Sequence, residues 1–127
     1  MGGRSSTYTQ AKLKGRSKFK NVRTTTPDGP THASKKEAAR WLFLKELEAA
    51  GVIRNLRRQV RHTLTVNGVK VGTYISDHEF NRVDTGVFVC EDVKSPRTAK
   101  LPLYRRNKRH MMAEHGIDVV EVFKHDA

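Results

Sequence analysis

Apolar and polar residues alternate through the middle of the chain with the period of two that is typical of a β-strand. The first such segment is Gln59–Val66, and the Asn67-Gly68 pair after it is a strong signal for a two-residue hairpin turn. The chain is then expected to return antiparallel to this segment. The strands predicted after the turn are Val69–Phe80, Val87–Lys94 and Ile117–Phe123.

Two segments with helical preferences flank these strands. Ser34 and Glu37 have the spacing of a capping box, and Ser34–Ala50 is rich in helix-favouring residues up to Gly51, which supplies a C-terminal stop. A second helix is predicted over Leu101–Glu114, with a proline in its first turn. The apolar face expected to pack the first helix on a sheet is Trp41, Leu42, Leu44 and Leu47.

The expected order is therefore α-β-β-β-α-β, an α/β (α+β) class with a mixed sheet flanked by helices. A length of 127 residues suits one domain with a single modest core. Residues 1–30 lack periodicity, are rich in Gly, Ser, Thr and Lys, and end in the turn signal Pro27-Asp28-Gly29-Pro30. We predict a flexible basic N-terminal arm over residues 1–30 and a single domain over residues 31–127.

The chain carries a formal charge of +12 and has a pI near 10.3. Its basic residues gather in Met1–Thr26, which holds no acidic residue, and in the segments Arg54–Arg61 and Lys100–Arg109. Such clusters favour nucleic acid as the partner over acidic protein or membrane lipid. The candidate nucleic-acid-binding residues are Lys18, Lys20, Arg105, Arg106 and Arg109.

Composition argues against several other functional classes. The single cysteine, Cys90, forms no internal disulfide, and its position within a strand favours a small buried side chain. No run approaches the roughly 18 apolar residues that a membrane span needs, and the polar start is unlike a signal peptide, so we expect a soluble, cytoplasmic protein. Zinc spacing and a phosphate-cradling glycine loop are missing, so no small-molecule cofactor is expected.

The hairpin between the second and third strands carries the candidate chemistry. Strand positions two apart share a face, so Asp92 and Lys94 point the same way. A tight turn or a four-residue loop centred on Asp84-Thr85 would place Asp77 across from Asp92. A three-residue loop would shift the register by one and turn Asp77 away, unless a β-bulge near the site restored the facing.

Two facing carboxylates and an ammonium on a strongly basic chain indicate a divalent-metal site aimed at a phosphodiester. Mg²⁺ prefers oxygen ligands and commonly takes one or two carboxylates, with water and phosphate completing its shell. The metal, Mg²⁺ or Mn²⁺, would neutralise the phosphate and lower the pKa of a bound water. Lys94 could then orient or deprotonate that water.

Two glutamates, Glu37 and Glu91, need separate interpretations. Glu37 has two: as the N3 residue of the capping box it would satisfy the backbone amide of Ser34, or it could bind the metal directly or through water. Glu91, next to Asp92 in the third strand, must face the opposite side of the sheet. We expect one of these two neighbours to meet solvent or a salt bridge, and the D-x-K spacing selects Asp92 as the partner of Lys94.

The order of these residues resembles the PD-(D/E)xK nuclease superfamily. The likeness rests on Glu37 in SKKEA, Asp77 in YISDHEF, and Asp92 with Lys94 in CEDVKS. Within the superfamily, the chain is similar to small phage proteins related to endonuclease I-type Holliday-junction resolvases. These share the SKKEA helix start, a glutamine before the first strand (here Gln59), a Y-x-x-D strand and an E-D-V-K strand. The resemblance covers about residues 18–123.

The resemblance implies a restriction-endonuclease-like core and Mg²⁺-dependent phosphodiester hydrolysis. Lys94 would act on the water, and the implied metal ligands are Asp77, Asp92 and Glu37. Gln59 would be peripheral to the site at most, and it could equally be a polar residue at the edge of a strand. Two departures from the family pattern matter. Glu79, two residues after Asp77, could compete as a ligand, and Ser95-Pro96 stands where a glycine is usual.

We therefore expect a metal-dependent endodeoxyribonuclease of a phage or mobile element that cuts branched or structured DNA in recombination. Cutting both strands of a junction needs two sites, so the family implies a homodimer. Two other hypotheses stay open. One is a non-catalytic nucleic-acid-binding protein that keeps the fold, and the other is a structural or assembly protein whose basic surface meets an acidic partner.

Overall fold

The structure of the chain is a computed structural model that describes residues 23–27, 31–32 and 34–123. The chain divides between Ala38 and Ala39 into two compact units. In the first unit, β1 (Thr24–Thr25) pairs antiparallel with β2 (Thr31–His32). β1 falls inside the stretch that we expected to be an irregular arm, and most of that stretch lies outside the described residues.

Helix α1 (Lys35–Ala49) has the ends that its sequence predicts. The backbone N–H of Glu37 donates a hydrogen bond of 3.1 Å to Oγ of Ser34, which confirms the N-cap. At the other end Gly51 takes a left-handed φ of 79°, and the N–H of the next residue donates a 2.9 Å bond to the carbonyl of Leu47. This arrangement satisfies carbonyls that the end of a helix leaves without a partner.

Leu42 is a correction to the predicted apolar face of α1, because 37% of its surface is exposed. The buried stripe runs instead through Trp41 and Leu44, with Leu47 partly buried. Successive helix residues are turned by about 100° from one another, so Leu42 points away from the side that Trp41 and Leu44 bury.

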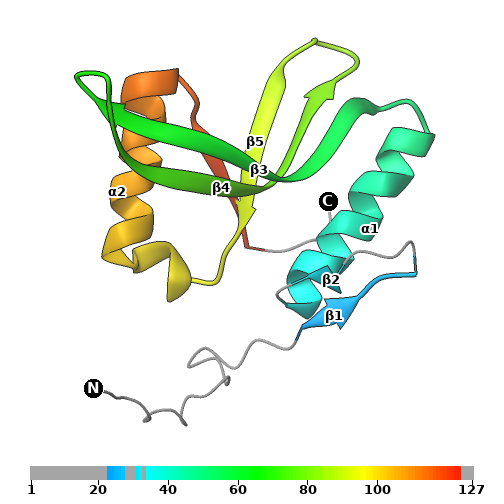
Figure 1. Cartoon of the computed structure of the whole chain (residues 1–127). Coiled ribbons are helices and arrows are strands. Elements are labelled where there is room, and N and C mark those ends of the chain that lie inside the picture. Colours follow the sequence, from blue (N-terminus) through cyan, green and yellow to red (C-terminus); the bar gives the residue numbers. More distant parts are fainter. Residues whose placement is uncertain (1–22, 28–30, 33, 124–127) are drawn as a thin grey trace, which may run out of the picture. The chain divides into compact units, whose positions relative to one another are not determined.

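Four strands form one sheet in the order β3-β4-β5-β6 (Figure 1). Their bounds are Ile53–Val66, Val69–Arg82, Phe88–Val93 and Val119–Val122. The first three pair antiparallel and β6 pairs parallel with β5, so the predicted mixed sheet is confirmed. The Asn67-Gly68 turn is also present, with φ values of 51° and 80° that suit a two-residue hairpin.

Strand β3 begins at Ile53, well before the predicted start at Gln59. Its register with β4 shifts between Arg54 and Arg57, and Asn55 has a left-handed φ of 58°. An irregularity of this kind breaks the alternation of faces. The period of two in the sequence therefore marks only the second part of the strand.

The second helix follows η1 (Thr98–Lys100) and consists of α2 (Pro102–His110) continued by a π-helical turn, η2 (Met111–His115). Gly116 ends it with a left-handed φ of 67°, close to the predicted end at Glu114. The class is α+β, with two long helices and a mixed sheet. Within the described ranges, no helix has the length and apolar character to cross a bilayer.

The core has two parts. In one, Leu44 of α1 packs with Ile53 and Phe80 of the sheet. In the other, Tyr104 and Met111 of the second helix pack with Leu64, Tyr74, Cys90 and Val119 of the sheet. Cys90 is thus the small buried side chain that we predicted.

Candidate functional site

The loop between β4 and β5 fixes which residues of the two strands face each other. The N–H of Arg82 donates a 2.9 Å hydrogen bond to the carbonyl of Val87, which closes a four-residue loop. From there the ladder runs without a shift to the pair His78↔Glu91. The four-residue loop that the sequence allowed is therefore confirmed, and the three-residue alternative is wrong.

Asp77 and Asp92 lie one step further along this register and face each other. The N–H of Asp77 donates a hydrogen bond of 2.9 Å to Oδ1 of Asp92, and Oδ2 of Asp77 accepts one of 2.8 Å from the N–H of Val93. Asp92 is buried, with 4% of its surface exposed, whereas Asp77 is half-buried. Each carboxylate is thus oriented by the backbone of the other strand.

Tyr74 and Lys94 converge on the second oxygen of Asp92. The Tyr74 hydroxyl donates a hydrogen bond to Oδ2, and Nζ of Lys94 lies 3.7 Å from the same atom. Lys94 also lies over the ring of Tyr104, with 4.0 Å between Nζ and the ring centroid. Burial, together with the charge of Asp92 and the hydrogen bond to it, raises the pKa of Tyr74 far above its usual value, so its hydroxyl stays a donor.

Gln59, beside the site, has an unusual backbone conformation, although the register of β3 with β4 does not shift there. Its φ is 53°, its side chain is exposed, and the register of β3 with β4 places it opposite Asp77. On β4 itself, Oγ of Ser76 donates a 2.9 Å bond to Glu79, although residues three apart in a regular strand face opposite sides. The candidate site therefore lies on a distorted part of the hairpin.

Glu37 is buried, with 4% of its surface exposed, and belongs to the first unit. Its backbone N–H donates the hydrogen bond that the Ser34 side chain accepts as the N-cap of α1. Its role as a metal ligand stays a prediction, because the carboxylates with which it would act belong to the second unit.

Glu91 makes the buried salt bridge that was one of its two expected environments. Its oxygens accept hydrogen bonds of 2.8 and 2.9 Å from Nε and Nη2 of Arg40 on α1. Nδ1 of His78 lies 3.3 Å from Oε2, and the His78 ring stacks on Trp41 with 5.9 Å between centroids. Burial works to raise the pKa of Glu91, but the bonds from His78 and Arg40 lower it, so the carboxylate stays charged.

Glu79, which could compete as a ligand, is buried and has other partners. Its Oε2 accepts the Ser76 bond and is hydrogen-bonded to Nε2 of His62. His62, Glu79 and Cys90 each offer a metal-ligand atom within 4.8 Å of the others. Burial first, and then the charge of Glu79, raise the pKa of the Cys90 thiol, which disfavours the thiolate that a metal would need.

A line of contacts leads from Lys94 to the end of the sheet. The Tyr104 hydroxyl donates a 2.9 Å hydrogen bond to Oε2 of Glu121, and Nζ of Lys108 lies 3.2 Å from the same oxygen. Burial works to raise the pKa of Glu121, but the bonds from Tyr104 and Lys108 lower it. Glu121 is the residue paired with Asp92 in the parallel register of β5 and β6.

Sequence reasoning missed Tyr74, Tyr104 and Glu121 as parts of this site. Tyr74 carried one signal, since it is the tyrosine of the Y-x-x-D motif. Tyr104 and Glu121 carried none, because each of their partners lies on another element.

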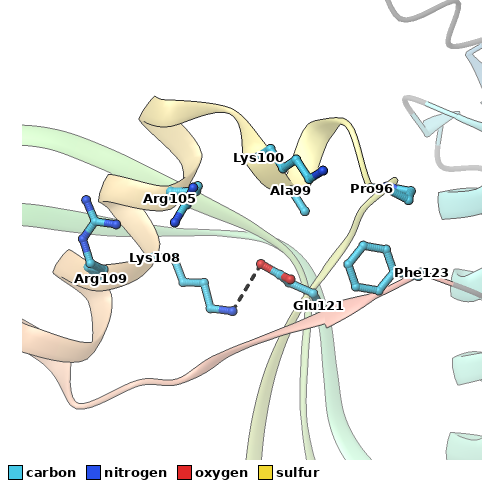
Figure 2. Close-up of a pocket in the computed structure, with 8 residues that line it drawn as sticks. All are labelled: Pro96, Ala99, Lys100, Arg105, Lys108, Arg109, Glu121 and Phe123. Atoms are coloured by element: carbon cyan, nitrogen blue, oxygen red, sulfur yellow. Dashed lines mark hydrogen bonds and ion pairs between the residues drawn. The ribbon is translucent and has the colours of Figure 1, made fainter.

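The predicted nucleic-acid-binding residues of α2, which are Arg105, Arg106 and Arg109, are all exposed. Arg105 and Arg109 line a pocket of about 730 Å³ that Figure 2 shows between α2, the preceding loop and β6. Lys18 and Lys20 lie outside the described residues.

Comparison of the chain with protein-family models, curated protein sequences and solved structures finds no match. The interpretation of the site therefore rests on its own chemistry. The structure brings together Asp77 of β4, Asp92 of β5 and Lys94, which directly follows β5, on a basic chain.

Proposed function

We propose that this protein is a metal-dependent endonuclease that hydrolyses phosphodiester bonds in DNA. The observation that carries the proposal is the grouping of Asp77, Asp92 and Lys94 where β4 meets β5. Two adjacent carboxylates repel a phosphate group unless a cation lies between the carboxylates and the phosphate. The formal charge of +12 supplies the long-range attraction for DNA that these acids alone would oppose.

The donor atoms suit a hard divalent cation. Asp77 and Asp92 offer carboxylate oxygens from adjacent strands, and Mg²⁺ or Mn²⁺ commonly binds through one or two such groups. When bound, the ion would supply neutralisation of the phosphate charge and a lower pKa for water at the site. The resemblance to PD-(D/E)xK nucleases adds Glu37 as a further ligand and a restriction-endonuclease-like core.

Lys94 has the position of a group that acts on the reacting phosphate or the attacking water. Its side chain is 18% exposed, so it is accessible to a substrate at the edge of the site. Because it is held between Asp92 and the Tyr104 ring, its ammonium presents a fixed positive charge where negative charge develops in the transition state. Tyr74 holds the Asp92 carboxylate in place, because the hydrogen bond from its hydroxyl restrains the carboxylate from rotating.

The same resemblance supports the biological setting of the proposal. An endonuclease similar to the resolvase-related phage proteins would cut branched DNA as a homodimer, with one site for each strand of the junction. Encoded by a phage or mobile element, it would act in recombination in the cytoplasm of the host cell. Arg105, Arg106 and Arg109 would grip the DNA backbone.

Cleavage by the purified protein tests this function. Labelled four-way-junction, linear duplex and single-stranded DNA are incubated with Mg²⁺ or with EDTA. We expect the wild type to cut junction DNA only with Mg²⁺, and Asp92→Asn to lose cleavage although it keeps the size of the side chain. Asp84→Asn is the matched control, because Asp84 lies in the same hairpin but is exposed and paired with Arg82.

A non-catalytic nucleic-acid-binding protein is the second candidate. It is favoured by the fact that both oxygens of Asp92 already accept hydrogen bonds. It predicts tight DNA binding by the wild type and by Asp92→Asn, with no metal-dependent cleavage of any substrate. An assembly protein with an acidic partner predicts weak DNA binding, whereas both nucleic-acid hypotheses predict binding that falls steeply as salt rises.

A further inference from the structure

The pocket of Figure 2 has features that the proposed cleavage chemistry does not use. Its volume of about 730 Å³ is in the range of pockets that hold small ligands. One part of its lining is apolar and consists of Pro96, Ala99 and Phe123. Another part is basic and consists of Lys100, Arg105 and Arg109. A ligand that suits both parts has a flat apolar face and negative charge.

The positive charges of the basic part are not neutralised by neighbouring carboxylates among the residues that the structure describes. Lys100, Arg105 and Arg109 are exposed, and none of them forms an ion pair within the described part of the chain. The carboxylate in the lining, Glu121, is already matched by Lys108 and by the Tyr104 hydroxyl. Figure 2 shows Lys108 directed at Glu121, away from the other cations. The net charge of the lining therefore favours an anion.

Phe123 supplies the flat apolar face. It exposes 42% of its surface, and its ring stands beside Glu121 in the pocket lining (Figure 2). An aromatic ring next to cations is the combination with which proteins bind single-stranded nucleic acid, because the base stacks on the ring and the phosphates meet the cations. A base inside a duplex is already stacked on its neighbours, so only an unpaired base can enter such a pocket.

One tyrosine connects this pocket to the candidate cleavage site. Tyr104 donates its hydroxyl hydrogen to Glu121 in the pocket, and its ring centroid lies 4.0 Å from Nζ of Lys94 in the site. Glu121 is also paired with Asp92 across β5 and β6, and paired strands lie about 4.8 Å apart. A nucleotide in the pocket would therefore be a close neighbour of a phosphodiester at Asp92.

We propose that this pocket binds an unpaired nucleotide beside the phosphodiester that is cut, with its base on Phe123 and its phosphates on Arg105 and Lys100. The inference rests on the proposed function, and it narrows the substrate to DNA with a single-stranded segment at the cleaved position. Flaps, overhangs and opened junction arms have such a segment, whereas blunt duplex does not. An acidic peptide would satisfy the cations but would gain nothing from the ring.

Binding measured in EDTA tests the inference independently of cleavage. Fluorescence anisotropy gives the affinity for a duplex with a single-stranded overhang and for the same duplex with blunt ends. A 2-aminopurine base in the overhang reports stacking through quenching of its fluorescence. The variants are Phe123→Ala, Phe123→Leu, which keeps apolar volume, and Phe123→Trp, which keeps the aromatic face. Phe88→Ala is the matched control, since Phe88 has a similar exposure of 39% and lies outside the pocket lining.

The expected result is specific to the overhang. Phe123→Ala and Phe123→Leu should weaken overhang binding by about 5- to 150-fold and abolish the quenching, as alanine substitution at base-stacking rings does. Phe123→Trp and Phe88→Ala should bind the overhang with the affinity of the wild type. All variants should bind the blunt duplex with the same affinity as the wild type.

Three results would overturn the inference. They are unchanged overhang binding by Phe123→Leu, an equal loss on blunt duplex, and displacement of the overhang by polyglutamate as readily as by an oligonucleotide of equal charge. The binding assay contains no metal, so its outcome does not depend on cleavage. A protein that binds the overhang as expected but cleaves no DNA with Mg²⁺ would refute the proposed nuclease activity and support the nucleotide pocket. A protein that cleaves DNA but shows none of the expected binding differences would support the nuclease and refute the pocket.

Discussion

The backbone N–H of Asp77 donates a 2.9 Å hydrogen bond to Oδ1 of Asp92 on the neighbouring strand. The reverse contact joins the N–H of Val93 to Oδ2 of Asp77 at 2.8 Å. Backbone donors cannot turn to other rotamers as side chains do, so the separation and orientation of the two carboxylates are set by the sheet itself. Such preorganisation is what a site needs if it is to act on a phosphodiester without first rearranging.

Replacing Lys94 by methionine should separate catalysis from binding. Lys94→Met keeps most of the length of the side chain but removes the ammonium that lies beside Asp92 and over the Tyr104 ring. We expect the rate of Mg²⁺-dependent cleavage to fall about 100-fold or more, with DNA affinity in EDTA changed by no more than about threefold. Single-turnover cleavage and anisotropy measure the two quantities.

Lys70→Met is the control for this experiment. Lys70 is an exposed lysine near the start of β4, away from the carboxylates, so the variant loses the same charge without touching the site. If Lys94→Met and Lys70→Met cleaved DNA at the same rate, Lys94 would have no part in the reaction.

The salt bridge of Arg40 and Glu91 should be the most sensitive polar contact of the fold. Its side chains are only 14% and 1% exposed, and Arg40→Met would leave the buried Glu91 charge poorly compensated. Loss of one partner of a buried pair costs about 3–5 kcal/mol. Urea denaturation followed by circular dichroism should show this as a lower midpoint for Arg40→Met.

Arg82→Met provides the comparison, because Arg82 also makes two hydrogen bonds to a carboxylate, that of Asp84, but in solvent. Its midpoint should stay at the wild-type value, since exposed pairs contribute little. Equal midpoints for the two variants would show that burial adds nothing to the Arg40 contact.

Tyr104 should make the fold sensitive to alkaline pH. Burial, and then the hydrogen bond to Glu121, raise its pKa well above the ordinary value of about 10. A raised pKa gives a stabilisation that is complete below the pKa of the unfolded tyrosine and is lost as the pH rises above it. We expect the urea midpoint to fall as the pH rises above about 10, with a smaller fall in Tyr104→Phe. Parallel curves for the two proteins would contradict this.

Glu114 should make the stability of the fold depend on pH in the acidic range. Hydrogen bonds from the hydroxyl and the N–H of Thr65 lower its pKa to about 2. Such a stabilisation is present above the ordinary pKa of glutamate, about 4.3, and is lost as the pH falls towards 2. Melting temperatures measured at low salt should therefore drop over this interval, and Glu114→Gln should remove part of the drop. A Glu114→Gln profile identical to that of the wild type would exclude this role.

Local signals account for what the sequence predicted correctly. The Asn67-Gly68 turn and the Ser34 cap each depend on residues within one turn or one helix end. The four-residue loop before β5 was one of the alternatives that the sequence left open. The loop sets the register, and the register sets the facing of Asp77 and Asp92. The facing of the two carboxylates therefore depends on the conformation of a few consecutive loop residues.

The remainder depends on contacts between distant parts of the chain. Arg40 and Glu91 are 51 residues apart, and no local pattern pairs them. The irregularity between Arg54 and Arg57, where Asn55 has a left-handed φ, hides the start of β3, because it interrupts the alternation that would have revealed it. Leu42 could not be told from its buried neighbours, since a helix that covers a sheet buries only one stripe.

The loop Val83–Gly86 also limits how this chain can evolve. Exposed loops normally accept insertions and deletions. Here one residue more or fewer, absorbed by a slip of β5 against β4, would exchange the sides on which Glu91 and Asp92 stand. The carboxylate that anchors Arg40 would turn towards Lys94, and the carboxylate beside Lys94 would turn towards Arg40. A change of length at this surface loop would thus be as damaging as a substitution in the core.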